Sequence, residues 1–340
     1  MKTDQGEETP AESLFVVGRF QPEDAEGIVA LFRDVYGEHY PIRLFYDPAA
    51  IIAANQEGRY YSIVTHTPSG QVVAVNHLFR SSPFPYLYET GVGLVLRKYR
   101  NLGINKQNLG YLYETFLPGM PHIQEVMGDA VCNHLHNQRA TKFFKFTETA
   151  LRVALMPAAA YAKEKSAPGR VASLTVFRCY HTRPHRIFLP EVYESELRWI
   201  YGRLDDSRDL CLSDGRIPEG AGTRAGMQMF DFAGVAIISV TTAGADLAAR
   251  IADLEKRARE KKSVVFQVCL NLTEPWIGEA VETLRKMGYF FGGALPRWFD
   301  GDGFLMQKLE CPPDFESIML ITDEAHRILD FIKTDQRSVS

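Results

Sequence analysis

The segment that decides the fold is Gly93-Leu-Val-Leu-Arg-Lys-Tyr-Arg100-Asn-Leu-Gly103-Ile-Asn105. It reads as an apolar strand, a short loop that contains Gly103, and the start of an amphipathic helix that runs to about Phe116. Backbone N–H groups at the start of a helix have no partner within the helix and lie at the positive end of its dipole. Gly103 lets the backbone approach a ligand closely, and Arg100 adds positive charge. The segment therefore predicts a site for a pyrophosphate group at the beginning of a helix.

The residues before this segment predict alternating strands and helices. Hydrophobic periodicity, turn residues and Pro22 at a helix start support each element. The expected order is a strand over 15–20, a helix from 22, a short helix over 49–55, a hairpin with strands 60–67 and 72–81, and a strand over 86–96.

The residues after it predict one further group of elements and then a second half of similar order. A strand over 125–133, a helix over 138–146 and a strand over 150–156 complete a first domain, residues 1–160. We expect a connecting section over 161–222, with a strand at 171–180 and a basic turn at 181–186, ending in glycine-rich sequence. A second domain, 223–315, precedes a C-terminal helix and tail, 316–340.

The order of these elements and the loop at Arg100 resemble the GNAT superfamily of acetyl-CoA-dependent N-acyltransferases over about residues 15–156. The family motif is arginine or glutamine, two residues, glycine, one residue, then glycine or alanine. Arg100 and Gly103 match it, and Asn105 stands at the last place. The resemblance implies an α/β fold (α+β by some schemes) with two GNAT-like domains, each a mixed, mostly antiparallel sheet flanked by helices.

The same resemblance implies acetyl-CoA as acyl donor and names the residues that bind it. Backbone groups of the strand would contact the pantetheine, and the loop with the helix start would hold the pyrophosphate. Asn137 matches a second family landmark, and Phe144 stands where many members carry a tyrosine that protonates the leaving thiolate. The predicted cofactor-binding residues are Gly93, Leu94, Val95, Arg100, Asn101, Leu102, Gly103, Ile104, Asn105 and Asn137.

Acyl transfer to an amine needs a group that removes a proton from the nucleophile. Glu89 is the first candidate, because its place eleven residues before Arg100 resembles the base of some GNAT histone acetyltransferases. A solvated strand carboxylate is the alternative reading. His134 is the second candidate, since it shares strand parity with Cys132 and His136 and titrates near neutral pH. We predict no metal, because no carboxylate or cysteine is spaced to complete a site with these histidines.

Composition excludes several function classes. The formal charge of -4 and pI near 6.2 leave no basic surplus for nucleic acid or an anionic membrane. The five cysteines are far apart, which favours a reduced, cytoplasmic protein without disulfides. The acidic, polar start lacks a secretory signal, and no apolar stretch approaches the roughly 20 residues of a membrane helix. A homodimer is compatible with the sequence.

These inferences combine into an N-acetyltransferase that moves an acetyl or other acyl group from CoA to a small-molecule or protein amine by direct attack. The second half carries no motif of this kind between residues 241 and 246, so it is expected to be a degenerate copy. Two alternatives stay open. One is a non-catalytic acyl-CoA sensor, favoured by Phe144 and Asn105, and the other is a CoA-independent aminoacyl transferase of related fold.

Overall fold

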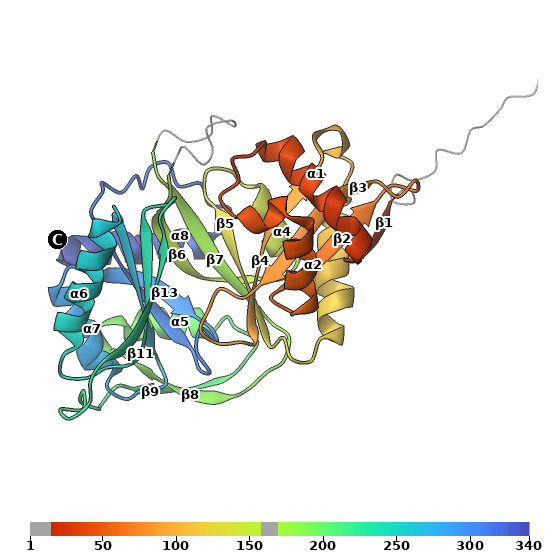
Figure 1. The fold of residues 1–340 in the computed structure, drawn as a ribbon. Helices are drawn as coiled ribbons and strands as arrows, with labels where there is room; N and C mark the ends of the chain where they lie inside the picture. Colours follow the sequence, from red (N-terminus) through yellow and green to blue (C-terminus); the bar gives the residue numbers. More distant parts are fainter. Residues whose placement is uncertain (1–14, 158–168, 340) are drawn as a thin grey trace, which may run out of the picture. The chain divides into compact units, whose positions relative to one another are not determined.

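The computed structural model describes residues 15–157 and 169–339. They divide into two units (Figure 1). Unit 1 holds residues up to 81 together with 88–123, and unit 2 holds 82–87 together with the described residues from 124 onward. The predicted domain boundaries at residues 160, 222 and 315 stay predictions.

Unit 1 is an antiparallel sheet with helices on both faces. Its strands lie in chain order and are β1 (Val16–Arg19), β2 (Tyr60–His66), β3 (Val72–Phe79) and β4 (Leu87–Val95). Its helical segments are η2 (Pro22–Asp24), α1 (Ala25–Tyr36), η3 (Arg43–Tyr46), α2 (Pro48–Gln56), η4 (Arg97–Tyr99), α3 (Ile104–Tyr111), the π-helical turn η5 (Leu112–Phe116) and η6 (Leu117–Gly119).

Local sequence explains why these helices form and where they pack. The Asp47 side chain caps α2 by accepting hydrogen bonds from two backbone N–H groups, and Pro48 occupies the first helical position. Phe32 of α1 stacks on Phe45 with ring centroids 4.3 Å apart, and both rings lie near His77 of β3. The next residue back, Asn76, contacts α3 instead. Since successive strand residues face opposite ways, α1 and α3 cover opposite faces of the sheet.

Unit 2 contains a mixed, mostly antiparallel sheet. Its strands lie in the order β5-β7-β6-β13-β14-β12-β11-β10, and the β11–β12 pair is parallel. Their bounds are β5 (Glu125–Val131), β6 (Thr147–Met156), β7 (Val171–Cys179), β10 (Arg224–Phe230), β11 (Val235–Thr242), β12 (Val265–Asn271), β13 (Phe290–Leu295) and β14 (Gly303–Leu309). A separate parallel pair joins β8 (His185–Leu189) to β9 (Arg208–Leu212).

The helices of unit 2 are α4 (His136–Phe143), η8 (Glu191–Tyr193), α5 (Glu194–Tyr201), α6 (Leu247–Glu260), α7 (Ile277–Lys286) and α8 (Asp323–Val339). The predicted fold class, α/β with a mostly antiparallel sheet flanked by helices, is confirmed. One order occurs twice within unit 2. In the chain, a strand, a helix and two further strands follow one another as β5, α4, β6, β7 and again as β12, α7, β13, β14. In the sheet, the last strand of each set lies between the other two, as β5-β7-β6 and β12-β14-β13.

Three elements differ from the sequence expectation. The strand predicted inside the connecting section is β7, which pairs with β5 on one side and β6 on the other. The basic turn predicted at 181–186 gives way to β8 at His185, and β13 forms where no strand was expected. β8 has only five residues and β13 carries two glycines, so their sequences show little alternation.

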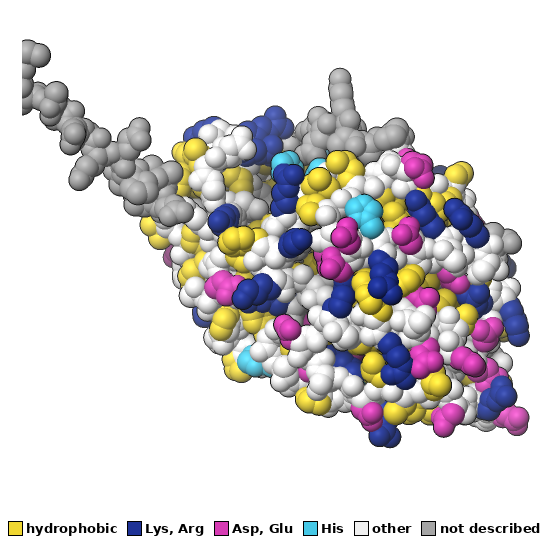
Figure 2. Space-filling model, turned by 180° about the vertical axis from the view of Figure 1, so that it is seen from behind, with side chains coloured by type: hydrophobic (Ala, Val, Ile, Leu, Met, Phe, Trp, Pro, Cys, Tyr) yellow, Lys and Arg dark blue, Asp and Glu magenta, His cyan; other side chains and the backbone are white. Residues whose placement is uncertain are grey.

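The surface and the helices bear on possible partners. None of the described helices is long and apolar enough to cross a membrane. On the face drawn in Figure 2, acidic and basic side chains are mixed over the lower and right parts, whereas basic side chains gather at the upper left.

Candidate functional site

The last part of β4 departs from regular strand geometry. Gly91 pairs with His77 and Leu94 pairs with Val75, so two residues of β4, Val92 and Gly93, lie opposite one residue of β3. Val92 has a φ of 54°, which is unusual for a β-branched residue. This is a β-bulge, a feature that bends a strand and leaves backbone groups outside the ladder. Of the predicted residues here, Gly93 is exposed, Leu94 is buried and Val95 is half-buried.

The loop after β4 is held in a defined conformation. Leu96 N donates to Val73 O at 2.9 Å, and Arg100 Nε donates to Val95 O at 3.3 Å. Asn101 and Gly103 have φ values of 64° and 76°. Asparagine and glycine are the residues that adopt this left-handed conformation most readily. The loop therefore reaches α3 through the two positions at which its sequence allows such a backbone.

The N-terminus of α3 is uncapped and surrounded by positive charge. Gly103 is its N-cap residue and no side chain caps it, so the first N–H groups of the helix remain available. Arg97, Lys98, Arg100 and Lys106 are all exposed around this turn. Together the oriented N–H groups and the cations fit a phosphate or pyrophosphate group.

A buried amide network anchors this turn to the sheet, and sequence reasoning missed it. Asn76 Nδ2 donates to Asn105 Oδ1 at 3.1 Å and to Asn108 Oδ1 at 2.9 Å. Asn108 Nδ2 in turn donates to Ile63 O and Thr65 Oγ1, both at 2.9 Å. The network gives the asparagine at 105 a hydrogen-bond partner in the sheet. Its partners are 29 and 32 residues apart, so no local pattern could have revealed it.

Glu89 lies on the face of unit 1 that α1 covers. Tyr60, Phe79 and Glu89 are successive partners across β2, β3 and β4. The rings of Tyr60 and Phe79 stack with centroids 5.5 Å apart. Burial and then the negative charge of Glu89 raise the pKa of Tyr60. The candidate base is therefore half-buried among aromatic rings.

The remaining predicted site residues belong to unit 2. The strand-parity argument for His134 is wrong, because β5 ends at Val131 and the residues that follow form a turn. The His134 ring lies 5.5 Å from that of His136, and Asn137 is exposed in the first turn of α4. The roles of His134 and Asn137 stay predictions.

Two residues near α4 are unsuited to proton or acyl transfer. Phe144 is buried and its ring packs edge-on against Phe143 at 5.0 Å. Burial raises the pKa of Cys132 to about 12, so its thiol stays protonated near neutral pH. A thiolate nucleophile at Cys132 is therefore disfavoured.

Among the residues that the structure describes, one group of metal-ligand types comes together that the sequence did not suggest. One ligand atom each from Glu125, Cys179 and Asp206 lies within 4.8 Å of the others, beside a cavity of about 10 Å³. Burial raises the pKa of Glu125 to about 8 and that of Cys179 to about 12, which favours their protonated forms. Arg208 already pairs with Asp206 at 3.0 Å. The geometry favours a closed polar cluster over a metal site.

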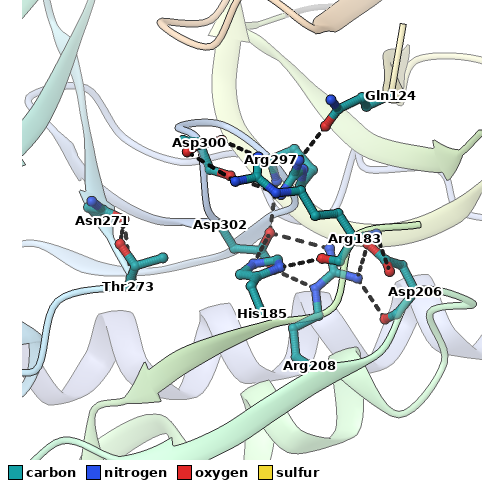
Figure 3. A network of polar contacts seen from close by, with 10 residues as sticks. All are labelled: Gln124, Arg183, His185, Asp206, Arg208, Asn271, Thr273, Arg297, Asp300 and Asp302. Atoms are coloured by element: carbon teal, nitrogen blue, oxygen red, sulfur yellow. Dashed lines mark hydrogen bonds and ion pairs between the residues drawn. The ribbon is translucent and has the colours of Figure 1, made fainter. Parts of the chain in front are cut away.

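That cluster continues into a buried ion network (Figure 3). Asp302 accepts from Arg208 Nε at 2.9 Å and from Arg297 N at 2.9 Å, and its Oδ1 lies 3.2 Å from His185 Nε2. Burial alone would raise the pKa of Asp302, but Arg208 and His185 outweigh it and hold that pKa well below its usual range. Asp302 is fully buried, and its contacts join the start of β14 to β8 and β9.

The corresponding helix start in the second half is covered by its own chain. A Cβ at Gly244 would lie 1.9 Å from Ala221 O. Gly244 N donates to Thr223 Oγ1 at 3.0 Å, and Thr223 N donates to Asp246 Oδ1 at 2.7 Å. The N-cap residue Asp246 also places a carboxylate at the start of α6, which disfavours an anion there, in agreement with the missing motif.

Comparisons with known proteins give a similarity over half of the chain. No family model matches the sequence, and no curated protein matches it. Among solved structures, the ribosomal-protein-S18-alanine N-acetyltransferase from Escherichia coli is 12% identical, with a TM-score of 0.39 over 50% of this chain and 96% of that chain. The ribosomal-protein-S5-alanine acetyltransferase from Vibrio fischeri is 9% identical, with a TM-score of 0.40 over 49% and 93%. The spermidine/spermine N-acetyltransferase from Vibrio cholerae is 9% identical, with a TM-score of 0.40 over 50% and 95%.

Proposed function

We propose that this protein is an acyl-CoA-dependent N-acyltransferase that uses acetyl-CoA and acts on an amine. The observation that carries the proposal is the uncapped N-terminus of α3, led by Gly103 and ringed by basic side chains, directly after the bulge in β4. An oriented set of N–H groups with exposed cations is suited to a pyrophosphate, and an irregular strand before it offers backbone groups to an amide-bearing chain.

The residues present fit acetyl-CoA. Residues 100–105 would hold the pyrophosphate through backbone N–H groups and the Arg100 guanidinium. Backbone groups of Gly93, Leu94 and Val95 would hold the pantetheine. When bound, acetyl-CoA supplies an activated acyl group that passes to the acceptor amine as CoA leaves.

Glu89 would act as the general base for the acceptor amine. An alkyl amine is protonated at neutral pH and becomes a nucleophile only after it loses a proton. Glu89 lies on the same strand as Val95, six residues earlier, and its half-buried carboxylate would accept that proton. His134 is the second candidate for this role. Phe144 has no proton to give to the leaving thiolate. Water or another residue would therefore supply that proton.

We further propose that the second half arose by duplication and binds no CoA. The repeated order of strands around α4 and α7 supports the duplication. The tight packing at Gly244 and the carboxylate of Asp246 at the start of α6 support the loss of cofactor binding. This half would then shape the acceptor site or an interface. The separated cysteines support a reducing compartment such as the cytoplasm, and a homodimer is untested.

The first experiment is thermal unfolding with and without acetyl-CoA and CoA, because a ligand that binds only the folded protein raises its melting temperature. It compares the native chain with Gly103→Glu and with the matched control Gly70→Glu. Both glycines have a left-handed backbone, with φ of 76° and 84°, and both have open space around an added Cβ. The two variants share the same strain and charge, and only the first puts a carboxylate at the helix start.

We expect acetyl-CoA to stabilise the native chain and Gly70→Glu but not Gly103→Glu. No stabilisation of the native chain at saturating acetyl-CoA would refute the proposal and favour a CoA-independent transferase. Thiol release from acetyl-CoA with a panel of amines then tests turnover. Stabilisation without turnover on any amine would favour the non-catalytic sensor.

A further inference from the structure

Four side chains of unit 1 form what we call the acid–aromatic cluster: Tyr40, Tyr60, Phe79 and Glu89. All four are half-buried. Glu89 and Phe79 are partners across β4 and β3, and the Tyr60 ring stacks on Phe79. Phe45 links Tyr40 to Tyr60, with ring centroids 5.9 and 5.7 Å away. The charge of Glu89 contributes, after burial and neighbouring tyrosines, to a raised pKa of Tyr40. The carboxylate therefore lies beside Phe79 and Tyr60, and Tyr40 joins these rings through Phe45.

Gly91 leaves room beside this carboxylate. It follows Glu89 on the same face of β4, and a Cβ added there would lie 3.9 Å from Glu89 Oε1 and 3.4 Å from a ring atom of Phe79. Any longer side chain at this position would fill the space between the acid and the ring. The glycine keeps that space accessible.

A buried polar atom lies beneath the cluster. His77 pairs with Gly91 across the sheet, is fully buried, and has ring centroids 4.8 Å from Phe45 and 6.0 Å from Tyr60. Its Nδ1 contacts Ser62 Oγ at 2.8 Å, and its Nε2 has no hydrogen-bond partner among the described residues. A buried polar atom without a partner is costly and needs an explanation. A polar group of a ligand, or a water that comes with it, would satisfy this nitrogen.

The chemistry of the cluster selects a particular kind of ligand. A carboxylate beside aromatic faces attracts an organic cation through charge and through the ring quadrupoles. The cluster contains a single carboxylate, so it suits one ammonium group rather than the several of a polyamine. Aromatic faces also stack on an aromatic ring more favourably than on an alkyl chain.

We propose that the acid–aromatic cluster binds the acceptor amine, and that this acceptor is a small primary monoamine whose short chain carries an aromatic ring. Glu89 pairs with the ammonium group, and the rings of Tyr60 and Phe79 pack against the aromatic end. The identification of this ligand as the acceptor rests on the proposed acyltransferase function. Its binding to the cluster does not.

Calorimetric binding tests the proposal without requiring turnover. The probes are 2-phenylethylamine, spermidine and a short peptide with a free alanine N-terminus, each titrated into the protein with CoA present. We expect 2-phenylethylamine to bind most tightly. Glu89→Gln should weaken its binding about tenfold or more, and Phe79→Leu by between about twofold and twelvefold, the range of one aromatic pair.

Two variants serve as controls. Glu57→Gln removes an exposed carboxylate of unit 1 that pairs with Arg59, and Phe232→Leu removes an aromatic ring that is 49% exposed outside the cluster. Neither should change amine binding. If Glu89→Gln does not fold, Phe79→Leu and the ranking of the three probes still decide the outcome.

Tighter binding of spermidine or of the peptide than of 2-phenylethylamine would overturn this inference. So would equal effects of the cluster variants and the control variants. Either result leaves the proposed acyltransferase function intact, provided acetyl-CoA still stabilises the protein. Conversely, a protein that binds 2-phenylethylamine through the cluster but does not respond to acetyl-CoA would retain the amine site and lose the proposed function.

Discussion

Replacing Gly93 by alanine should loosen the loop before α3 from the sheet. A Cβ at this position would lie 2.0 Å from Asn76 Oδ1, well inside the 3.4 Å at which ordinary contact begins. The Asn76 amide must therefore move by more than 1 Å or rotate. Its Nδ2 then loses the hydrogen bonds to Asn105 and Asn108. At about 1 kcal/mol for each bond, with an added penalty for the buried Asn108 oxygen, the cost in unfolding free energy is about 2–3 kcal/mol.

Two measurements report this change in unit 1. Hydrogen exchange followed by mass spectrometry should show faster exchange of the α3 amides, because the helix has lost its anchor. Calorimetry should show weaker binding of acetyl-CoA, because the N–H groups of the helix start are no longer held in place. Tryptophan fluorescence is the wrong probe, since Trp199, Trp276 and Trp298 all lie in unit 2.

A matched control and a double variant sharpen the test. Gly18→Ala also changes a strand glycine of unit 1, but nothing lies within 4 Å of its added Cβ, so it should be neutral. Asn76→Ala removes the amide that clashes. The double variant Gly93→Ala/Asn76→Ala should therefore be no less stable than Asn76→Ala alone. Additive losses in the double variant, or exchange rates in Gly93→Ala equal to those of Gly18→Ala, would refute the reasoning.

Three further predictions concern unit 2. Asp302→Asn leaves a buried arginine without its full partner and should lower the free energy of unfolding by about 3–5 kcal/mol, measured by urea unfolding with tryptophan fluorescence. Asp300 is exposed, so Asp300→Asn should lower it by about 1 kcal/mol or less. Equal losses of stability in the two variants would contradict the buried ion network. Because burial raises the pKa of Glu125 from 4.5 to about 8, its stabilising contribution is complete below pH 4.5 and is lost as pH rises through about 8. Glu125→Gln should flatten that decline in a melting-temperature profile, and parallel profiles would count against it. Cys132 should resist iodoacetamide at pH 8 in the folded protein and react with it in urea. The partly exposed Cys211 should react both in the folded protein and in urea. Labelling of Cys132 in the folded protein would show that its thiol is accessible.

Much of the fold and part of the site could be predicted from local sequence. The order of strands and helices up to β6 follows from hydrophobic periodicity and turn residues, and each predicted element there has a counterpart in the structure. The loop from Arg100 to Asn105 was identified because glycine, asparagine and basic residues within a few positions determine its backbone and its charge. Such properties depend on near neighbours alone.

Other features depended on residues far apart in the chain. The register of three strands places Glu89 beside Phe79 and Tyr60, and nothing near Glu89 indicates that environment. The misjudged parity of His134 has the same origin, since the end of β5 depends on its pairing with β7.

The sequence by itself determined the succession of elements up to β6, the left-handed glycine turn with its basic residues before α3, and the lack of such a motif before α6. Only the tertiary structure decided that Asn76 anchors that turn, that aromatic rings surround Glu89 and that Asp302 is a buried ion-pair partner. The physical reason is that periodicity, capping and backbone conformation arise from interactions within a few residues, whereas burial, pKa and hydrogen-bond partners depend on which distant segments the fold brings together.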